Sequence, residues 1–239
     1  MSGTPTKTEM IAEGKAKKIY ATTDPTRLIF HFKDDATAFN AQKRGTIESK
    51  GMLNQRISAR LFTLLKGKGI DNHYVATLSD REMLVERLQI IPVETILRNL
   101  VTGSCGKRLA RPEGEELKKP IIEFSYKSDE LGDPLINDDH AIAFGWATAA
   151  ELAEIRRQTL AVNDFLKAFM AERGILLVDF KLEFGRTPGG RVLLADEICP
   201  DTCRFWDAAT RKKLDKDRFR QDLGEVSEAY IEIDRRTAM

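Results

Sequence analysis

The stretch of sequence that decides the fold is GILLVDFKLEFG, residues 174–185. Its apolar density predicts a buried strand, yet Asp179, Lys181 and Glu183 recur inside it at every second position. Because side chains alternate across a strand, these three ionisable groups share one face. Two carboxylates among apolar residues are costly unless a cation lies beside them. The pattern therefore predicts either the floor of an active site or the solvated face of a hairpin that carries a Lys–Asp pair.

The residues that follow predict that this strand turns back on itself. RTPGGR (186–191) is a strong turn signal, and VLLADEICPD (192–201) is a second apolar strand that ends in acids. A loop over 187–190 would pair Arg186 with Arg191 across the hairpin. This register also decides which face of the hairpin each acid occupies.

The same register brings another carboxylate to the acidic face. It places Asp196 opposite Lys181 and one diagonal step from Glu183, close enough for one cation to touch both acids. A slip of one residue would put Asp196 on the other face. Two carboxylates without a nearby histidine or thiolate suit Mg²⁺, which binds through one or two carboxylates and substrate phosphates. If the two acids repel each other until the metal arrives, removing either one should leave the metal-free protein at least as stable.

The first ninety or so residues are rich in predicted strands. KKIYAT (17–22) and LIFHFKD (28–34) bracket the turn signal TTDP, and MLVERL (83–88) is a further alternating segment. Helical patterns dominate later. Strands and helices that are partly segregated along the chain predict an α+β fold with a β-rich N-terminal part.

Helices are predicted where apolar residues recur at helical spacing. The first ends at a glycine-rich turn, the second begins at a capping box of Thr148 and Glu151, and the last lies near the C-terminus. Their apolar stripes are Leu53, Ile57, Leu61 and Leu64; Leu152, Ile155, Val162, Leu166 and Phe169; and Phe219, Leu223, Val226, Tyr230 and Ile233.

The composition argues against several classes of protein. Among 239 residues, 38 basic and 37 acidic side chains nearly cancel, which disfavours broad attraction to nucleic acid or an anionic membrane. No apolar stretch approaches the roughly 20 residues of a membrane helix, and the first ten residues lack the apolar core of a secretory signal. Three cysteines without a CxxC pair are consistent with a reducing compartment. We therefore expect a cytoplasmic protein that binds neither nucleic acid nor membrane.

Two basic segments could receive phosphate. In EGKAKKIY (13–20), Lys15 and Lys17 lie on one side of a strand just after a glycine, which suits phosphate oxygens but equally describes a lysine-decorated edge strand. TGSCGKRL (102–109) is not a P-loop, because that motif needs glycine where Val101 stands and Ser or Thr in place of Arg108.

What remains near the second segment is a set of cations that indicates either an anion pocket or an ordinary surface loop. Its polar residues are Arg98, Ser104, Lys107 and Arg108. Further along, PDTCRFWD (200–207) predicts a turn that projects Arg204. Lys216 and Arg220 are four residues apart and share a helix face, which could bind carboxylate or phosphate groups or be merely solvated.

Three other chemistries lack support. The three histidines are far apart in the sequence and near no Ser or Cys nucleophile motif. Cys199 and Cys203 lack a second ligand pair, so a structural zinc site is not expected. No GxGxxG motif indicates a dinucleotide. The cysteines are expected to be dispensable for chemistry, because nothing near them indicates thiolate activation.

Taken together, these segments resemble the phosphoribosylaminoimidazole-succinocarboxamide synthase (SAICAR synthetase) family, ATP-dependent ligases of purine biosynthesis. The resemblance covers nearly the whole chain in order, through EGKAKKIY, FKDDATAFNAQKRGTIESKG, MLVERLQIIPVETILRNLVTGS, EFSYKSDELGDPLIND, LLVDFKLEFG, ADEICPDTCRFWD and DKDRFRQDLG. It implies a two-lobed, ATP-grasp-related α+β fold with nucleotide between the lobes. We expect an antiparallel, β-rich nucleotide-binding lobe over 1–86 and a larger α+β lobe over 87–239 that carries the metal and substrate sites.

The resemblance also implies residue roles. Lys15 and Lys17 would meet the ATP phosphates, and the strand at 84–88 would bind adenine through its backbone, at Val85, Glu86 and Leu88. Glu183 and Asp196 would hold Mg²⁺ on those phosphates. Arg98, Ser104 and Arg204 would bind the carboxyaminoimidazole ribotide, and Asp179, Lys181 and Arg220 would lie close to the reacting groups or L-aspartate. Asp133 would line the same pocket, Lys216 would also bind substrate, and Arg204 would share the catalytic role of Asp179 and Lys181. Asn40 stands where many relatives have aspartate, so no further metal ligand is assigned there.

The implied reaction joins aspartate to a carboxylate through an acyl phosphate, because a free carboxylate has no good leaving group. The protein would mainly supply position and electrostatics, without a nucleophile of its own. Two alternatives remain: a small-molecule kinase of the same general fold, which would need no amino acid, and a non-catalytic nucleotide- or RNA-binding module, which would need no paired metal acids. A homodimer is usual among bacterial members of the family.

Overall fold

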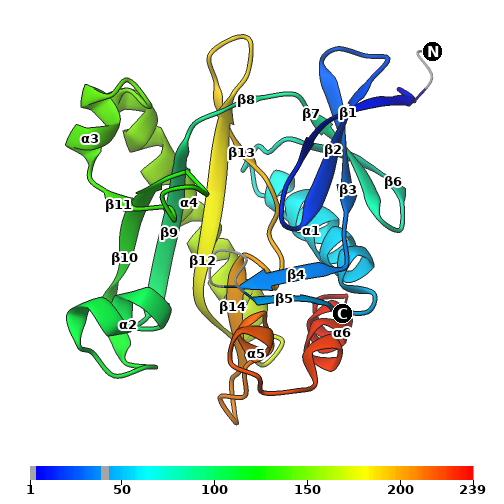
Figure 1. Ribbon diagram of the computed structural model, residues 1–239. Coiled ribbons are helices and arrows are strands. Elements are labelled where there is room, and N and C mark those ends of the chain that lie inside the picture. The colour runs from blue at the N-terminus through cyan, green and yellow to red at the C-terminus, as the bar shows by residue number, and fades with distance from the viewer. Residues whose placement is uncertain (1–3, 39–42, 239) are drawn as a thin grey trace.

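The protein is an α+β molecule with two main antiparallel sheets, seen in a computed structural model that describes residues 4–38 and 43–238 (Figure 1). The N-terminal sheet has the order β1 (Lys7–Glu13), β2 (Lys17–Thr22), β3 (Arg27–Phe32), β7 (Glu82–Glu86), β6 (Tyr74–Ser79). The larger sheet has the order β11 (Leu135–Ile136), β10 (Glu116–Tyr126), β9 (Val93–Leu100), β12 (Ile175–Arg186), β13 (Val192–Ala195); β14 (Cys203–Asp207) and β8 (Gln89–Ile90) also pair with β12. A separate ribbon joins β4 (Asp35–Ala38) to β5 (Lys43–Thr46).

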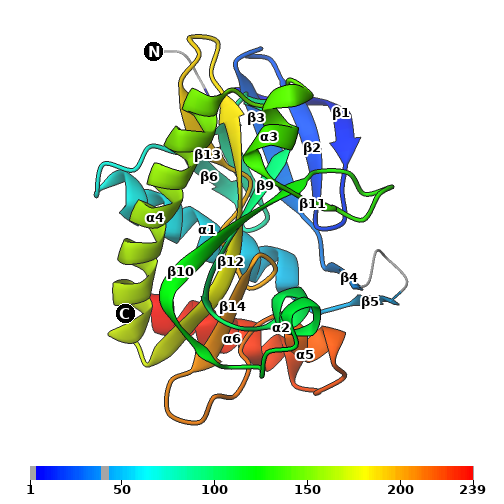
Figure 2. The same cartoon turned by 90° about the vertical axis from the view of Figure 1, so that its left-hand side faces the viewer.

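Helices cover the outer sides of these sheets. They are α1 (Lys50–Lys66), α2 (Gly103–Leu109), α3 (Asp138–Ala143), α4 (Ala149–Ala171), α5 (Asp217–Arg220) and α6 (Val226–Thr237). Figure 2 shows α4 running along the flank of the large sheet, where it packs on β9, β12 and β13. α1 packs against α6 and against β3, β6 and β7 of the N-terminal sheet. Within the described residues, no helix is both long and apolar enough to span a membrane.

β12 is the central element, as the opening stretch predicts. It pairs with β9, β13, β14 and β8, and its apolar residues are buried on both sides. Phe180 and Phe184 are among the largest fully buried side chains, and they belong to the core that the sheet shares with α1 and α4. Asp179 and Glu183 within this strand are only 2% and 4% exposed, so they do not form an ordinary solvated hairpin face.

The predicted register of the β12–β13 hairpin is wrong by one residue. Arg186 pairs with Val192 rather than Arg191, and Lys181 lies opposite Ile96 of β9 rather than Asp196. The cause is the turn. The Thr187 hydroxyl accepts the N–H of Arg191 at 3.1 Å, and the Thr187 N–H donates to the Arg191 carbonyl at 2.9 Å. Arg191 therefore belongs to the loop.

The helix predictions are confirmed in the middle of the chain and need correction at two places. The capping box of α4 is present: Thr148 Oγ1 accepts from the Glu151 N–H, and Glu151 Oε2 accepts from the Thr148 N–H. In α1 the buried stripe ends at Leu65, fully buried, whereas Leu64 is 36% exposed. The buried face therefore continues from Leu61 to Leu65, four residues later, and not to Leu64.

The predicted C-terminal helix is two helices. Asp222, Gly224 and Glu225 have φ of 56°, 67° and 48°, and these left-handed residues separate α5 from α6. Leu223, expected on the apolar stripe, is 46% exposed. The segment 102–109, considered as an anion loop, instead forms the short helix α2.

The sheet assignment changes directly after β7, because β8 already pairs with β12. A lobe boundary at residues 86 and 87 stays a prediction, since α1 lies before it and shares a hydrophobic core with the large sheet.

Candidate active site

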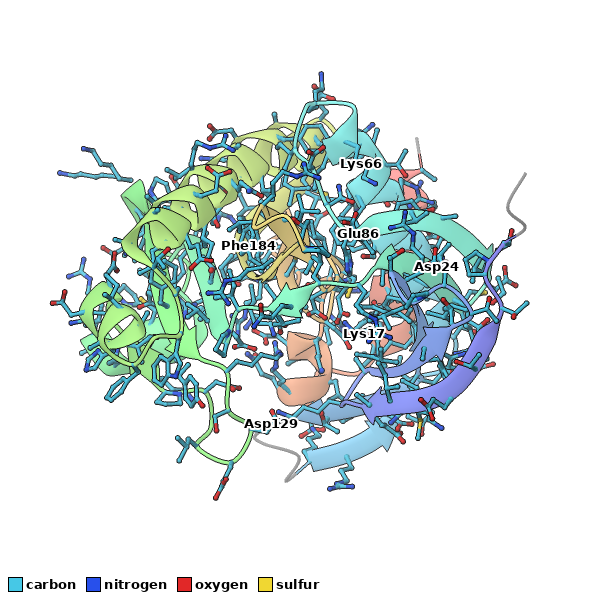
Figure 3. The ribbon with its side chains drawn as sticks, turned by 90° about the horizontal axis from the view of Figure 1, so that it is seen from above. Lys17, Asp24, Lys66, Glu86, Asp129 and Phe184 are labelled. Atoms are coloured by element: carbon cyan, nitrogen blue, oxygen red, sulfur yellow. The ribbon has the colours of Figure 1, made fainter. Side chains whose placement is uncertain are left out.

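A cavity of about 620 Å³ lies between the N-terminal sheet and the large sheet. Most of the predicted site residues line it: Lys15, Lys17, Arg98, Asp133, Asp179, Lys181, Glu183, Asp196, Arg204, Lys216 and Arg220. Figure 3 shows Lys17 on the side of the N-terminal sheet that faces the rest of the molecule, and Asp129 on the loop after β10. The cavity thus collects residues from both ends of the sequence.

Four predicted residues do not line the cavity. Ser104 on α2 lies behind Arg98, whose Nη2 is 3.3 Å from the Ser104 hydroxyl. Val85 is fully buried in the N-terminal core, and the Glu86 N–H already donates to the carbonyl of His73 at 2.7 Å. Leu88 lies between β7 and β8 against Gly185. Adenine binding by this segment stays a prediction, and Asn40 lies outside the described residues.

The acidic face of β12 is neutralised by lysines. Lys181 Nζ donates to Glu183 Oε1 at 2.9 Å and to Glu94 Oε1 at 2.6 Å, and Lys127 Nζ reaches Glu183 Oε1 at 2.6 Å. Burial would raise the pKa of Glu183, but Lys181 and then Lys127 hold it below its ordinary value. The pKa of Lys181 is well above its ordinary value, because Glu183 and Glu94 outweigh burial. Glu183 is therefore ionised, and its charge is stabilised by two ammonium groups.

Asp196 reaches the same cavity by a route that the sequence did not indicate. The observed register alone would turn it to the opposite face, but β13 ends at Ala195 and Asp196 has φ of 61°. This left-handed conformation, which Asp adopts more readily than most residues, redirects the chain after β13. His73 supports this turn, with Nε2 at 3.1 Å from the Asp196 carbonyl oxygen. Burial lowers the pKa of His73 to about 4, so the ring is neutral at pH 7 and Nε2–H is the donor.

Lys17 of β2 and Lys15 of the loop before it each form ion pairs with acids of the large-sheet side of the cavity. Lys17 Nζ contacts both Asp196 Oδ1 and Glu197 Oε2, and only 8% of Lys17 is exposed. Lys15 Nζ instead reaches Asp129 at 2.7 Å across the mouth of the cavity, and both partners are exposed. The N-terminal sheet and the large sheet are thus joined by ion pairs at the cavity itself.

The arginine side of the cavity is built by strand register. Asp179 of β12 lies opposite Arg98 of β9 on one side and Arg204 of β14 on the other. Its Oδ2 accepts from Arg98 Nη1 at 2.7 Å and from Arg204 Nη1 at 2.9 Å. Arg204 therefore projects from a strand and not from a turn. A carboxylate between two guanidinium groups keeps both directed at one small volume.

A buried ion pair supports the third side of the cavity. Asp201 accepts from Lys50 Nζ at 2.7 Å and from the Tyr230 hydroxyl at 2.6 Å, while Lys216 Nζ lies at 3.6 Å. The pKa of Asp201 is below its ordinary value, because Lys216 and Lys50 outweigh its burial. Burial lowers the pKa of Lys216 although Asp201 raises it. Asp201 thereby holds Lys216 at the cavity wall.

Several residues of this site were missed by sequence reasoning: Glu94, Lys127, Glu197, Asp201 and Asp217. One could have been found. Glu94, Ile96 and Arg98 recur at period two in VETILRN, so Glu94 and Arg98 share a strand face. Lys127 belongs to a loop whose spacing carries no such signal.

Carboxylates, lysines and arginines around a cleft between two sheets are typical of an enzyme that acts on phosphorylated, anionic substrates. No group of three or more His, Cys, Asp or Glu side chains in the described part of the chain could hold a metal ion. A cation held by fewer protein carboxylates would complete its coordination with water or with oxygens of a bound substrate.

Comparison with known proteins agrees with this class. The family profile of SAICAR synthetase matches residues 10–237. A phosphoribosylaminoimidazole-succinocarboxamide synthase from Clostridium acetobutylicum is 56% identical over 227 residues, which cover 95% of this chain and 96% of the relative.

Solved structures give the same result. The crystal structure of phosphoribosylaminoimidazole-succinocarboxamide synthase from Ehrlichia chaffeensis has a TM-score of 0.95 at 47% identity, covering 96% of this chain and 98% of that one. A SAICAR synthetase in complex with ADP has a TM-score of 0.92 at 49% identity, covering 95% and 96% of the two chains. The chain belongs to the SAICAR synthetase family, and its two-lobed α+β fold is the fold of that family.

Proposed function

We propose that the chain is an ATP-dependent ligase of purine biosynthesis. It joins L-aspartate to the carboxylate of 5-amino-1-(5-phospho-D-ribosyl)imidazole-4-carboxylate (carboxyaminoimidazole ribotide) and releases SAICAR, ADP and phosphate. Family membership over nearly the whole chain supports the reaction. The structural observation that carries the proposal is a single cavity with paired acids and lysines on one side and three arginines on another.

The three regions of the cavity match the three parts of such a reaction. Lys15 and Lys17 are suited to the phosphates of ATP, because ammonium groups neutralise phosphate oxygens. Arg98 and Arg204, held by Asp179, are suited to the ribotide. Lys216, Arg220, Asp133 and Lys181 line the same cavity and are suited to L-aspartate and the reacting groups.

The chemistry needs activation of a carboxylate. Transfer of the γ-phosphoryl group to the ribotide carboxylate forms an acyl phosphate, and the amine of L-aspartate then displaces phosphate to form the amide. Lys181 lies on the acidic face and can neutralise charge that develops on the transferring group. Positioning accounts for the remainder of the rate gain, so no protein nucleophile is required.

Glu183 and Asp196 fit a magnesium site of the open kind. Mg²⁺ binds through one or two carboxylates and completes its coordination with water and substrate phosphates. Glu183 is ionised and buried, and Asp196 lines the same cavity. A bound Mg²⁺ would supply neutralisation of charge on the ATP phosphates. Lys127 and Lys181 both donate to the same oxygen of Glu183, so both ammonium groups would lie close to such an ion.

Four further features are proposed for this chain. They are a nucleotide-binding lobe over 1–86, adenine contacts from Val85, Glu86 and Leu88, a homodimer, and a cytoplasmic location. No part of the reaction above depends on them.

Coupled ADP release with each substrate omitted in turn tests the function. ADP should form at a substantial rate only with ATP, Mg²⁺, the ribotide and L-aspartate all present. Equal ADP release without L-aspartate would instead indicate a kinase. Nucleotide binding without turnover would indicate a binding module.

A further inference from the structure

Asp217 holds two cavity arginines from behind. It begins α5, only 2% of it is exposed, and it is not among the residues that line the cavity. Its Oδ2 accepts from Arg204 Nε at 2.7 Å, and its Oδ1 accepts from Arg220 Nη1 at 2.6 Å. Arg204 and Arg220 both line the cavity. One buried carboxylate thus joins a strand-borne and a helix-borne guanidinium group.

We propose that Asp217 is a positioning residue that fixes Arg204 and Arg220 side by side for the anionic groups of two substrates. The identity of those substrates, the ribotide and L-aspartate, rests on the proposed function. Arginine side chains are long and flexible, and a carboxylate that accepts from both restricts them before any ligand arrives. Without it, the two like charges would repel each other and spread apart.

The two arginines depend on Asp217 to different degrees. Arg204 keeps another carboxylate partner, because its Nη1 donates to Asp179 at 2.9 Å. For Arg220, Asp217 is the only carboxylate partner within 4 Å in the described ranges 4–38 and 43–238. Loss of Asp217 should therefore displace Arg220 more than Arg204. The KM for the substrate that Arg220 binds should therefore rise more.

The carboxylate is itself fixed by the backbone around it. Asp215 accepts the Asp217 N–H at 2.7 Å with one oxygen and the Phe205 N–H at 2.9 Å with the other. This ties the start of α5 to β14, next to Arg204. Burial would raise the pKa of Asp217, but Arg204 and Arg220 keep it below its ordinary value. Asp217 is therefore charged as well as immobile.

Gly103 provides room for the arrangement. It has φ of 55°, and a Cβ at this position would lie 2.8 Å from Arg204 Nη2. A side chain at this position would require the guanidinium group of Arg204 to shift. Arg204 is thus confined by Asp217, Asp179 and the backbone at Gly103.

The test compares Asp217→Asn with a matched control. Asp234 on α6 is the same kind of residue in another place: it is 9% exposed and accepts from Arg56 Nη1 at 2.9 Å, with Arg60 Nη2 at 3.0 Å. In Asp217→Asn, the KM for the ribotide and for L-aspartate should rise about 10-fold to 100-fold, the range seen when a supporting partner of a site residue is lost. The KM for ATP should stay within about twofold. Asp234→Asn should lower thermal stability and leave all three KM values at the parental level.

A conservative variant separates position from charge. Asp217→Glu keeps the charge but moves it by one methylene, so KM for both anionic substrates should rise, by up to about 100-fold. If Asp217→Asn does not fold, this variant carries the test alone.

The outcomes distinguish this inference from the proposed function. Parental KM values for both anionic substrates in a folded Asp217 variant would overturn the positioning role, as would an equal rise in the KM for ATP. A parent chain without aspartate-dependent ADP release would instead overturn the proposed function. In that case, calorimetric titration of the ribotide into parent and Asp217→Asn decides the positioning role, and equal affinities would refute it.

Discussion

Replacing the two proposed metal acids one at a time should separate stability from turnover. Glu183 accepts from two lysines with one oxygen, at 2.6 and 2.9 Å, and only 4% of it is exposed. Glu183→Gln keeps the shape but removes the charge that both lysines contact. Lys181 retains Glu94 at 2.6 Å, whereas Lys127 then has Glu94 only at 4.0 Å. Breaking a buried ion pair from one side costs about 3–5 kcal/mol. The Lys127 side chain is 43% exposed, so solvent screens its share.

These terms set the size of the expected change. We expect Glu183→Gln to lower the free energy of unfolding by about 2–3 kcal/mol, or the Tm by about 4–12 °C for a chain of this size. The sequence alone predicts the opposite sign, because Glu183 and Asp196 would repel each other in the metal-free protein. The lysine partners reverse that prediction.

Asp196→Asn should behave differently. Its partner Lys17 retains the Glu197 carboxylate, so no cation is left unpaired. Asparagine also tolerates the left-handed φ of 61° at this position. We expect a change below about 1 kcal/mol in the free energy of unfolding.

Turnover should fall in both variants. Loss of one electrostatic contact to the transferring group costs about 3–4 kcal/mol in the barrier, or about 10²–10³ in kcat. The assays are thermal unfolding without metal or nucleotide and coupled ADP release. A parental Tm for Glu183→Gln, or equal destabilisation of both variants, would refute the ion-pair reasoning. Near-parental turnover in either variant would show that the acid has no part in the chemistry.

Three further predictions concern other parts of the chain. Hydrogen bonds from Arg186 first, and then from Thr148, lower the pKa of Glu151 to about 2. Above pH 4.3 the Tm of the parent should therefore be about 2–4 °C higher than that of Glu151→Gln, and this difference should disappear as the pH falls towards 2. A difference in Tm that does not change with pH would contradict this. Gly103→Ala should raise the KM for the ribotide by displacing Arg204, whereas Gly145→Ala, also at positive φ but with open space around it, should lower only stability; equal KM values would refute the contact. Replacing the three buried cysteines by serine should lower the Tm but keep kcat within about threefold, and a folded variant without turnover would show that a thiol takes part.

The local features of the fold could be predicted because they depend on neighbours in sequence. Asp179, Lys181 and Glu183 do line one cavity, since a period of two fixes the face of each residue on a strand. The capping box of Thr148 and Glu151 likewise involves residues three apart. Such patterns need no knowledge of the remainder of the chain.

The hairpin shows where a local pattern is insufficient. Its register depends on hydrogen bonds between Thr187 and Arg191, which shift the pairing by one residue. Asp196 still reaches the acidic face, but through a left-handed turn that the buried His73 supports. The predicted meeting of Glu183 and Asp196 in one cavity was therefore correct, while the geometry given for it was wrong.

By itself, the sequence determined the class of fold, the active-site strand and most of the charged residues that line the cavity. Only the tertiary structure decided which charge neutralises which. Lys181 meets Glu94, 87 positions away, and Lys17 meets Asp196, 179 positions away. The physical reason is that an ion pair depends on distance in space, and that distance is set by strand register and by the packing of two sheets. The spacing of residues along the chain predicts neither the register nor the packing.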